Sequence, residues 1–407
     1  MRRISAVLLL PLLLCSCVSA AGSVYEISAV TEESGYTCMV TEDVTLNGIW
    51  ISQFDITDIW CDEAGQRPRD EFTSAVKELC TGIAAEGYNA VFVQVRPYGD
   101  SFYPSAFYPP SAYAVGAYGN TFTYDPLEIF LSCAHSAGLE FHAWINPYRL
   151  MKTDEVCLLP EDSLIRRCAD AGMFAEYDGR LYILPSDISR CRMILDGVRE
   201  LVTGYAVDGV HIDDYFYPTS DPSFDGEAFA LSGEPDMLAW RRNNVSRLVG
   251  EIYSVVKECD RDCVFGVSPA GNIDYSYNYC CADIYLWCSS EGYLDYILPQ
   301  VYFGYSNPIC PFSETLDNWI SVVTNPDIRL YVGLAAYKVG APDAFAGAMS
   351  NEWIDTPGML TRQIAESKEK TDGCVLFSYR YVFGKDVPHR PETQKTLPLP
   401  FADKHAY

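Results

Sequence analysis

The segment Asp208-Gly-Val-His-Ile-Asp-Asp-Tyr-Phe-Tyr217 joins a short apolar run to two adjacent carboxylates and a cluster of aromatic residues. Its first part, Gly209–Tyr215, has the length and composition of a β-strand buried on both faces, as in a parallel sheet. Alternation places His211, Asp213 and Tyr215 on one side of this strand. Charged side chains facing an apolar interior cost free energy unless they are paired or serve chemistry. The segment therefore predicts a polar site at the end of a buried strand.

Similar apolar runs, each followed by a helical or loop stretch, recur along the chain. The other predicted strands are Gly48–Phe54, Asn89–Arg96, Glu140–Asn146, Val264–Pro269, Tyr296–Tyr302, Leu330–Tyr337 and Cys374–Tyr379. Helical apolar spacing covers residues 69–86, 125–138, 187–206, 236–259, 281–291, 313–324 and 358–369. Eight strands alternating with helices predict an α/β fold, a single (β/α)8 barrel of the TIM type. An eighth helix is not evident after the last strand.

The 407-residue chain divides into four expected segments. These are a lipoprotein-type signal at residues 1–17, a leader or tether at 18–45, the barrel at 46–385 and a tail at 386–407. Two arginines precede the apolar run Ala6–Leu14, which is too short to span a bilayer. A small residue stands directly before Cys17, so Cys17 is the predicted site of lipidation. The alternative is an ordinary signal peptide cleaved near Ala20 or Ala21. We therefore expect an exported protein, either on the outer face of the cell membrane or secreted.

Composition excludes several classes of protein. The formal net charge of −26 argues against nucleic-acid binding, which relies on clustered Lys and Arg. Contact with a membrane is expected only through the N-terminal lipid. The 16 cysteines show no zinc-finger spacing and the five histidines are scattered, so we expect thiols or a few disulfides, no metal site and no cofactor. Phosphate-loop, dinucleotide-binding and Gly-x-Ser-x-Gly motifs are absent from the sequence.

Polar residues gather at the predicted carboxyl ends of the strands, where barrel enzymes place their active sites. Gln94 and Arg96 share one face of the second strand, and His142, Trp144 and Asn146 share one face of the third. The fifth, sixth and seventh strands also end in polar residues. We therefore expect these side chains to meet at the mouth of the barrel.

The adjacent carboxylates Asp213 and Asp214 are the predicted catalytic pair. Neighbouring carboxylates repel each other, so the pKa of one should rise and allow it to act as a general acid. The alternative is an ordinary pair that caps a helix or binds Arg149. The chain contains 29 tyrosines, many of them in the predicted mouth loops, and with Trp144 they suit stacking against sugar rings.

At the level of motifs, the chain resembles the glycosyl-hydrolase-like family ten. The resemblance runs from about residue 46 to 380. It is carried by Gly48-Ile-Trp-Ile-Ser52, Gln94-Val-Arg-Pro-Tyr-Gly-Asp-Ser-Phe-Tyr-Pro-Ser105, Tyr124-Asp-Pro-Leu127, Glu140-Phe-His-Ala-Trp-Ile-Asn-Pro-Tyr-Arg149, Asp208-Gly-Val-His-Ile-Asp-Asp-Tyr-Phe-Tyr-Pro218, Trp240-Arg-Arg-Asn-Asn-Val245, Phe265-Gly-Val-Ser-Pro269 and Asp295-Tyr-Ile-Leu-Pro-Gln-Val-Tyr302.

This resemblance implies a barrel glycosidase whose partner is a polysaccharide. The family includes bacterial lipoproteins and a divisome-localised glycosidase that cuts peptidoglycan strands stripped of their stem peptides. The implied substrate is thus the N-acetylglucosamine–N-acetylmuramic acid backbone of the cell wall. Asp213 and Asp214 fall on the family's acidic pair. Its other mouth positions fall on Arg96, Asp100, His142, Asn146, Tyr148, Arg149, His211, Ser268, Gln300 and Tyr302.

Two mechanisms remain open from the sequence, which has no Glu at the end of the fifth strand. In one, Asp213 attacks the anomeric carbon and Asp214 or Asp100 protonates the leaving oxygen. In the other, the 2-acetamido oxygen of the substrate attacks, Asp213 orients that amide and Asp214 is the acid. Arg96 or Arg149 is expected to pair with the lactyl carboxylate of muramic acid. The alternative functions are an inactive barrel that binds cell-wall glycan, or a hydrolase of another polysaccharide.

Overall fold

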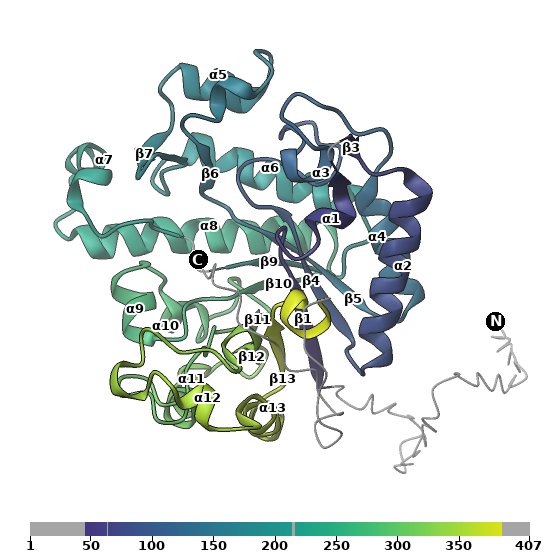
Figure 1. Cartoon of the computed structure of the whole chain (residues 1–407). Helices are drawn as coiled ribbons and strands as arrows, with labels where there is room; N and C mark the ends of the chain where they lie inside the picture. The colour runs from purple at the N-terminus through teal and green to yellow at the C-terminus, as the bar shows by residue number, and fades with distance from the viewer. Residues whose placement is uncertain (1–44, 63, 214–215, 385–407) are drawn as a thin grey trace, which may run out of the picture. The chain divides into compact units, whose positions relative to one another are not determined.

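Eight parallel strands form a closed barrel in this computed structural model, which describes residues 45–62, 64–213 and 216–384 (Figure 1). The strands are β1 (Leu46–Ile51), β4 (Ala90–Arg96), β5 (Glu140–Ile145), β9 (Gly209–Ile212), β10 (Val264–Val267), β11 (Tyr296–Ile297), β12 (Arg329–Ala335) and β13 (Gly373–Phe377). Around the barrel the order is β1-β13-β12-β11-β10-β9-β5-β4. The predicted fold is confirmed. The predictions for the signal segment, the tether, the tail, Cys17, Asp214 and Tyr215 lie outside the described residues.

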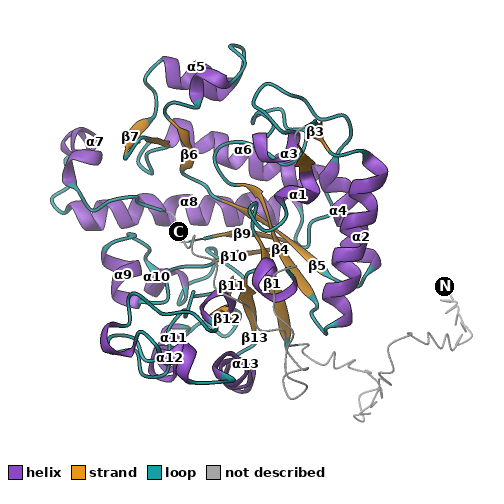
Figure 2. Cartoon of the chain, viewed as in Figure 1, coloured by secondary structure: helices purple, strands orange, loops and turns teal. Residues whose placement is uncertain are grey.

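Helices surround this barrel, as Figure 2 shows. The long ones are α2 (Arg69–Ala85), α4 (Pro126–Ser136), α6 (Ile188–Gly204), α8 (Met237–Cys259), α11 (Phe312–Val322) and α13 (Met359–Lys370). Local signals explain where they start: the Asp125 side chain accepts hydrogen bonds from the N–H groups of Leu127 and Glu128, and Pro126 occupies the first helical position of α4. No helix in the described part of the chain is both long enough and apolar enough to cross a membrane.

The predicted helix over residues 281–291 is wrong. That region contains only the single turn α10 (Ile284–Trp287), whose C-cap is Cys288, and the left-handed φ of 56° at Cys281 keeps the first residues of the predicted range out of a right-handed helix. The short helix α9 (Ile273–Asn278) precedes it. After the last strand, the described residues contain α14 (Tyr379–Phe383), a helix of five residues that packs near β1.

Further elements lie in the loops and were not predicted from the sequence. The loop after β5 carries a three-stranded antiparallel sheet with the order β6-β8-β7. Its strands are β6 (Arg149–Lys152), β7 (Ala175–Tyr177) and β8 (Arg180–Tyr182), and the other loop elements are α1 (Thr57–Trp60), β2 (Cys61–Asp62), β3 (Gly65–Gln66), α3 (Ala112–Val115), α5 (Leu164–Asp170), α7 (Gly226–Ser232) and α12 (Glu352–Asp355), with 3₁₀ turns at Val156–Leu158, Pro222–Phe224, Ala336–Lys338 and Gly347–Met349.

The barrel interior is filled by inward-facing side chains at alternate strand positions. A buried cluster there contains Leu46, Trp50, Ala90, Phe92, Trp144, Tyr296, Leu298 and Val375. Gly266 on β10 lies against the ring of Tyr296, and a Cβ at that position would overlap the ring. A larger apolar core packs the helices against the outer face of the strands. The interior is therefore a packed floor, and the site must lie above it.

Candidate active site

Asp213 follows β9 directly and its side chain is 4% exposed. Its Oδ2 accepts a hydrogen bond of 2.6 Å from Nδ2 of Asn146 and one of 3.1 Å from Nε1 of Trp144. Amide and indole N–H groups can only donate, so both complement an ionised carboxylate. The structure thus brings together three of the predicted site residues at the carboxyl ends of β5 and β9.

The side chain of Asn146 is itself oriented by a series of amides. The backbone N–H of Gln53 donates to Oε1 of Gln94 at 3.1 Å, and Nε2 of Gln94 donates to Oδ1 of Asn146 at 2.7 Å. Because Oδ1 accepts, Nδ2 of Asn146 must face Asp213. This series, which we call the amide relay, links residues that follow or belong to β1, β4, β5 and β9. The amide relay begins at the backbone N–H of Gln53 and ends at the Asp213 carboxylate, whose orientation it therefore fixes.

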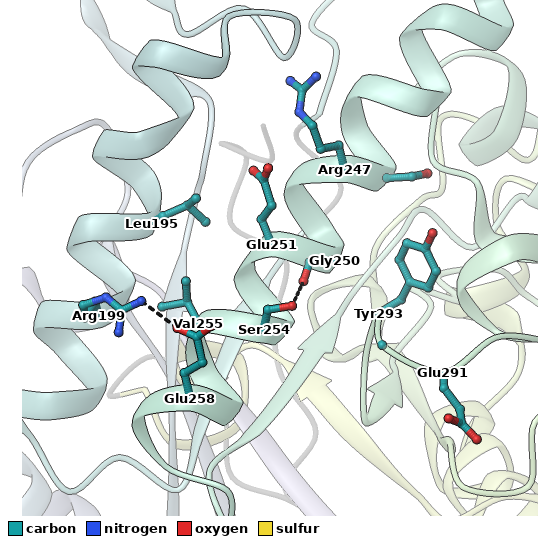
Figure 3. Close-up of a pocket in the computed structure, with 12 residues that line it drawn as sticks. Leu195, Arg199, Arg247, Gly250, Glu251, Ser254, Val255, Glu258, Glu291 and Tyr293 are labelled. Carbon is teal, nitrogen blue, oxygen red and sulfur yellow. Dashed lines mark hydrogen bonds and ion pairs between the residues drawn. The ribbon is translucent and has the colours of Figure 1, made fainter.

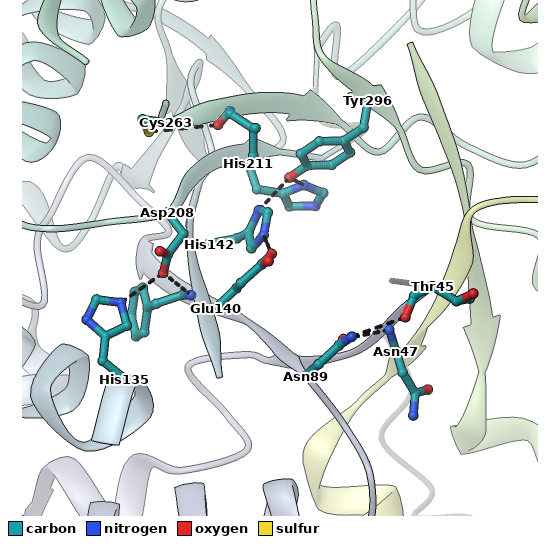
Figure 4. A network of polar contacts seen from close by, with 12 residues as sticks. Thr45, Asn47, Asn89, His135, Glu140, His142, Asp208, His211, Cys263 and Tyr296 are labelled. Atoms are coloured by element: carbon teal, nitrogen blue, oxygen red, sulfur yellow. Dashed lines mark hydrogen bonds and ion pairs between the residues drawn. The ribbon is translucent and has the colours of Figure 1, made fainter. Parts of the chain in front are cut away.

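The predicted site residues His142 and His211 lie deeper than the mouth. His211 is two residues before Asp213 on the same face of the strand, which places it about 7 Å closer to the amino end of the barrel. Both imidazoles are almost fully buried and contact the hydroxyl of Tyr296 through Nδ1, each at 3.1 Å (Figure 4). In this conformation they belong to the packed floor beneath Asp213.

Hydrogen-bond chemistry assigns a tautomer to each imidazole. Nε1 of Trp50 can only donate, so the Nε2 atom of His211 that it contacts at 3.2 Å carries no proton. Nδ1 of His211 then donates to Tyr296, whose hydroxyl donates to Nδ1 of His142. Nε2 of His142 donates to the Glu140 carboxylate at 3.4 Å. Burial, and to a smaller degree His142, lowers the pKa of His211 well below its usual value, so His211 is neutral.

Arg96 also lies away from the mouth. A register shift between Gln94 and Arg96 interrupts the alternation of β4. The Arg96 guanidinium donates to the hydroxyl of Tyr108 at 2.7 Å and stacks on the Tyr108 ring at 4.6 Å. The Tyr108 hydroxyl in turn donates to the carbonyl of Met193 on α6. The prediction that Arg96 faces the mouth is wrong for this structure, because the bulge turns its side chain toward α6.

Asp100 and Tyr148 are both buried as well. Oδ1 of Asp100 accepts the backbone N–H of Tyr98 at 2.9 Å, so this carboxyl group holds the loop that follows β4. Burial raises the pKa of Asp100, and a hydrogen bond from Ser111 partly offsets that rise. Tyr148 is 1% exposed, and its hydroxyl has no hydrogen-bond partner among the described residues.

Ser268, Gln300 and Tyr302 follow β10 and β11 and remain at the mouth edge. The Oγ atom of Ser268 is buried and has no hydrogen-bond partner in the described ranges. Nε2 of Gln300 donates to the carbonyl of Ser268 at 3.2 Å. The Tyr302 ring packs edge-on against Tyr337 at 5.8 Å and lies 6.0 Å from Phe377. These side chains form an aromatic and polar wall beside the strand that carries Asp213.

A buried ion pair anchors the loop that follows Asp213. Nε of Arg241, on α8, donates to Asp225 at 3.0 Å, and its Nη2 donates to the carbonyl of Asp221 at the same distance. The guanidinium also stacks on the Tyr217 ring at 4.9 Å. Arg241 and Asp225 are nearly inaccessible to solvent. The position of this loop therefore depends on one arginine of α8.

Sequence reasoning missed several residues that organise the mouth. Gln53 and Gln94 build the amide relay, and the alternation of β4 had placed Gln94 on the correct face. Asp55 accepts hydrogen bonds from the hydroxyls of Ser52 and Ser378 at 2.6 and 2.7 Å, so it ties the end of β1 to the end of β13. No spacing pattern in the sequence connects positions 52 and 378.

A recess of 560 Å³ lies elsewhere, on the outer wall between α6, α8 and residues 291–293 (Figure 3). It is lined by polar residues such as Arg199, Glu251 and Tyr293, and it is separate from the carboxyl ends of the strands. No group of three or more His, Cys, Asp or Glu side chains suited to a metal ion occurs in the described residues. No two cysteines in these same residues form a disulfide.

Comparison with known proteins identifies the family. The family described as Glycosyl hydrolase-like 10 matches residues 45–354, which is most of the chain. The chain belongs to this family. Membership confirms the resemblance seen in the strand-end motifs and the predicted enzyme class, glycoside hydrolase.

Individual relatives agree with this assignment. Glycosyl hydrolase YngK of Bacillus subtilis is 34% identical over 364 residues, which cover 83% of this chain and 69% of that protein. Glycosyl hydrolase DigH of Escherichia coli K12 is 29% identical over 430 residues, covering 97% of this chain and 95% of that protein. The glycoside hydrolase domain of PgaB (BpsB) from Bordetella bronchiseptica superimposes with a TM-score of 0.54 at 12% identity, covering 82% of this chain and 94% of that one, and this likeness shows the fold alone.

Proposed function

We propose that this family member hydrolyses glycan strands that contain N-acetylhexosamine, with the peptidoglycan backbone as its substrate. The observation that carries the proposal is the placement of Asp213: one carboxylate at the barrel mouth, held by Trp144 and Asn146. A carboxylate whose orientation is fixed before the substrate binds stabilises positive charge at an anomeric carbon without reorganisation. The motif resemblance to peptidoglycan glycosidases supports the choice of substrate.

The substrate-assisted route fits this site best. The 2-acetamido oxygen of the sugar forms a bond to the anomeric carbon while the bond to the leaving oxygen breaks. Asp213 accepts a hydrogen bond from the acetamido N–H and stabilises the charge that develops on that group. Asp214, the next residue in the sequence, protonates the leaving oxygen, and water then opens the cyclic intermediate. Burial raises the pKa of Asp100, but Asp100 is fully buried and its Oδ1 accepts the backbone N–H of Tyr98, so a leaving oxygen does not reach it, which favours Asp214 as the acid.

Sugar contacts follow from the wall of the mouth. The Oγ of Ser268 is a buried hydroxyl whose hydrogen-bonding capacity is unmet by the described residues, so a substrate hydroxyl or amide is a suitable partner. Tyr302 offers an aromatic surface to a pyranose ring, and aromatic faces at protein surfaces combine apolar contact with a polar edge. Both residues lie one or two strands away from Asp213 around the barrel.

Turnover of purified, peptide-free glycan strands tests the proposal, with products identified by mass. Asp213→Asn and Asp214→Asn should each lower kcat by roughly three orders of magnitude, the scale seen when a group acting directly in catalysis is removed. Asp262→Asn, an exposed change near the amino end of the barrel, is the matched control and should leave kcat unchanged. If both active-site variants remain active, the assignment is wrong. Affinity for the strands without turnover would instead favour a glycan-binding barrel.

A substrate without the acetamido group separates the two mechanisms. If the acetamido oxygen is the nucleophile, replacing the group with a hydroxyl should abolish cleavage by the intact enzyme. Equal rates on both substrates would instead favour direct attack by Asp213 and a covalent glycosyl-enzyme intermediate. Trapping of such an intermediate by mass spectrometry is the complementary measurement.

We further propose that the protein acts outside the cytoplasm as a lipoprotein. The support is the apolar run Ala6–Leu14, followed by the small residue and cysteine at Ser16-Cys17. Cys17→Ala should shift the protein from the membrane fraction to the soluble exported fraction. An unchanged distribution would favour cleavage near Ala20 or Ala21.

A further inference from the structure

Two arginines of the sheet after β5 share one aromatic ring. The guanidinium carbon of Arg149 lies 4.8 Å from the centroid of the Tyr98 ring, and that of Arg180 lies 4.5 Å from the same centroid. Arg149 begins β6 and Arg180 begins β8, and these two strands pair in an antiparallel sheet. Stacking on the ring holds two like charges in one small region.

The second arginine, Arg180, is held by a backbone carbonyl and not by a carboxylate of the described residues. Its Nη1 donates to the carbonyl of Leu150 at 2.7 Å, which fixes the direction of the guanidinium. Among the residues that the structure describes, no carboxylate oxygen lies within 4.0 Å of Arg180. The whole chain nevertheless carries a formal net charge of −26. A preformed cationic position in so acidic a protein is suited to an anionic ligand.

This cluster lies at the same edge of the barrel as Asp213. Arg149 is three residues after Asn146, so their Cα atoms are at most about 11 Å apart. Tyr98 is two residues after the end of β4, the neighbour of β5 in the barrel. The loops after these two strands therefore bring Tyr98, Arg149 and Arg180 to the rim, next to the strand that ends at Asp213.

We propose that Tyr98, Arg149 and Arg180 form a subsite for a sugar that bears a free carboxylate, namely the 3-O-lactyl group of an N-acetylhexosamine. The proposal rests on the proposed function. A guanidinium presents parallel N–H donors that match a carboxylate in a bidentate contact. In a strand that carries stem peptides the same carboxyl group is an amide without charge. The subsite therefore selects peptide-free strands by reading a charge. The sequence had predicted that Arg96 or Arg149 pairs with the lactyl carboxylate. The Arg96 guanidinium stacks on Tyr108 instead, and Arg180 is the arginine that lies beside Arg149.

Two substrates that differ only in charge test this subsite. One is a peptide-free glycan oligomer with its lactyl carboxylates intact, and the other is the same oligomer after conversion of those carboxylates to methyl amides. The variants are Arg149→Gln and Arg180→Gln, which keep a long polar side chain. Arg261→Gln is the matched control, because Arg261 is an exposed arginine near the amino end of the barrel. The readout is the ratio of kcat/KM for the charged oligomer to kcat/KM for the neutral one.

The intact enzyme should prefer the charged oligomer, and each subsite variant should lower that ratio by roughly tenfold, as expected for loss of a charge-assisted contact. The preference should also weaken as salt is raised. An unchanged ratio in both variants overturns the subsite. An equal loss on both oligomers also overturns it, because it indicates a structural role.

A binding measurement tests the subsite independently of catalysis. N-acetylmuramic acid and its methyl ester are titrated into the intact protein, and NMR or calorimetry reports their binding. Preferential binding of the free acid that Arg180→Gln removes and Arg261→Gln preserves supports the subsite even if no glycan is cleaved. Equal binding of acid and ester to the intact protein contradicts it, whether or not the enzyme turns over.

Discussion

The amide of Asn146 donates to Oδ2 of Asp213 across 2.6 Å, and the other end of that amide is already committed to Gln94. Rotation of Asn146 by half a turn would place two oxygens, Oδ1 and Oδ2, against each other. The carboxylate therefore meets a donor that has one allowed orientation. Such preorganisation is the property that lowers an electrostatic barrier in a buried site.

Removal of this donor should slow catalysis while substrate affinity changes little. We expect Asn146→Ala to lower kcat by about 10- to 100-fold, a range near the loss of a single preorganised donor. Gln94→Ala should have a smaller effect of the same kind. The double variant should lose less than the product of the two single losses, because Gln94 acts through Asn146. Strictly multiplicative losses, measured as kcat on glycan oligomers, would contradict the relay.

The imidazole tautomers should be visible by NMR. We expect His211 to carry its proton on Nδ1 and His142 on Nε2, because Trp50 can only donate at one end of the chain of contacts and the Glu140 carboxylate accepts at the other. The ¹⁵N shifts of the two rings at pH 7 measure this. Tyr296→Phe removes the hydroxyl between them and should disturb both rings. The opposite tautomer on His211 would contradict the assignment.

Stability should depend on pH through His211. The folded protein holds this imidazole neutral, because burial lowers its pKa well below the usual 6.5, whereas the unfolded chain protonates it normally. As pH falls below about 6.5 the unfolded state binds a proton that the folded state does not, so stability is present above this pH and is lost below it. Relative to a His211→Asn variant, the wild-type free energy of unfolding should fall by up to about 1.4 kcal/mol per pH unit.

Urea unfolding at pH 7.5, 6.5 and 5.5 measures that difference. Burial raises the pKa values of Asp55 and Asp100, so these two groups change the stability with pH in the direction opposite to His211. Their contributions are the same in the wild type and the variant, and they cancel in the difference between the two proteins. If the free energy of unfolding changes with pH by the same amount in the two proteins, His211 is not held neutral in the folded state.

Breaking the Arg241–Asp225 pair should be costly. Arg241→Met leaves the Asp225 carboxylate buried without its cation, and loss of one partner of a buried pair costs about 3–5 kcal/mol. The loop after Asp213 should also loosen, so kcat should fall in the fraction that folds. The exposed pair of Arg199 and Glu258 supplies the control. Arg199→Met should barely shift the thermal midpoint, because exposed pairs contribute little. Similar midpoints for the two variants would contradict the anchoring role.

The barrel could be predicted because its strands repeat one physical pattern. The strand Ala90–Arg96, for example, is buried over its whole length and is apolar except for Gln94 and Arg96, and stretches with helix-like spacing separate such strands. The residues at which the strands end were harder to predict. The regular part of β10 stops at Val267, before Pro269, since proline lacks the N–H that a sheet ladder requires. The helix expected at 281–291 is reduced to one turn, Ile284–Trp287, and apolar spacing does not report the left-handed Cys281 that excludes the first residues of that range.

The site could be predicted only in part because alternation gives the face of a strand and not the depth along it. Trp144, Asn146 and Asp213 meet at the mouth, while His142 and His211 share their faces but lie below. The sequence pattern of β4 did not predict the bulge between Gln94 and Arg96, which directs the Arg96 side chain away from the barrel mouth. Contacts between distant segments, such as the shared Tyr98 ring, become visible only in three dimensions.

The amide relay has a consequence for how this scaffold can change. The orientation of the Asp213 side chain is set by groups on neighbouring strands of the barrel. The first of these groups is the backbone N–H of Gln53, which cannot exchange donor for acceptor as a side-chain amide can. The sheet β6-β8-β7, which follows β5 at the rim, and the helix α3 supply none of the groups of that relay. Engineering could therefore exchange those segments for ones suited to a different polysaccharide while the reactive group keeps its aim.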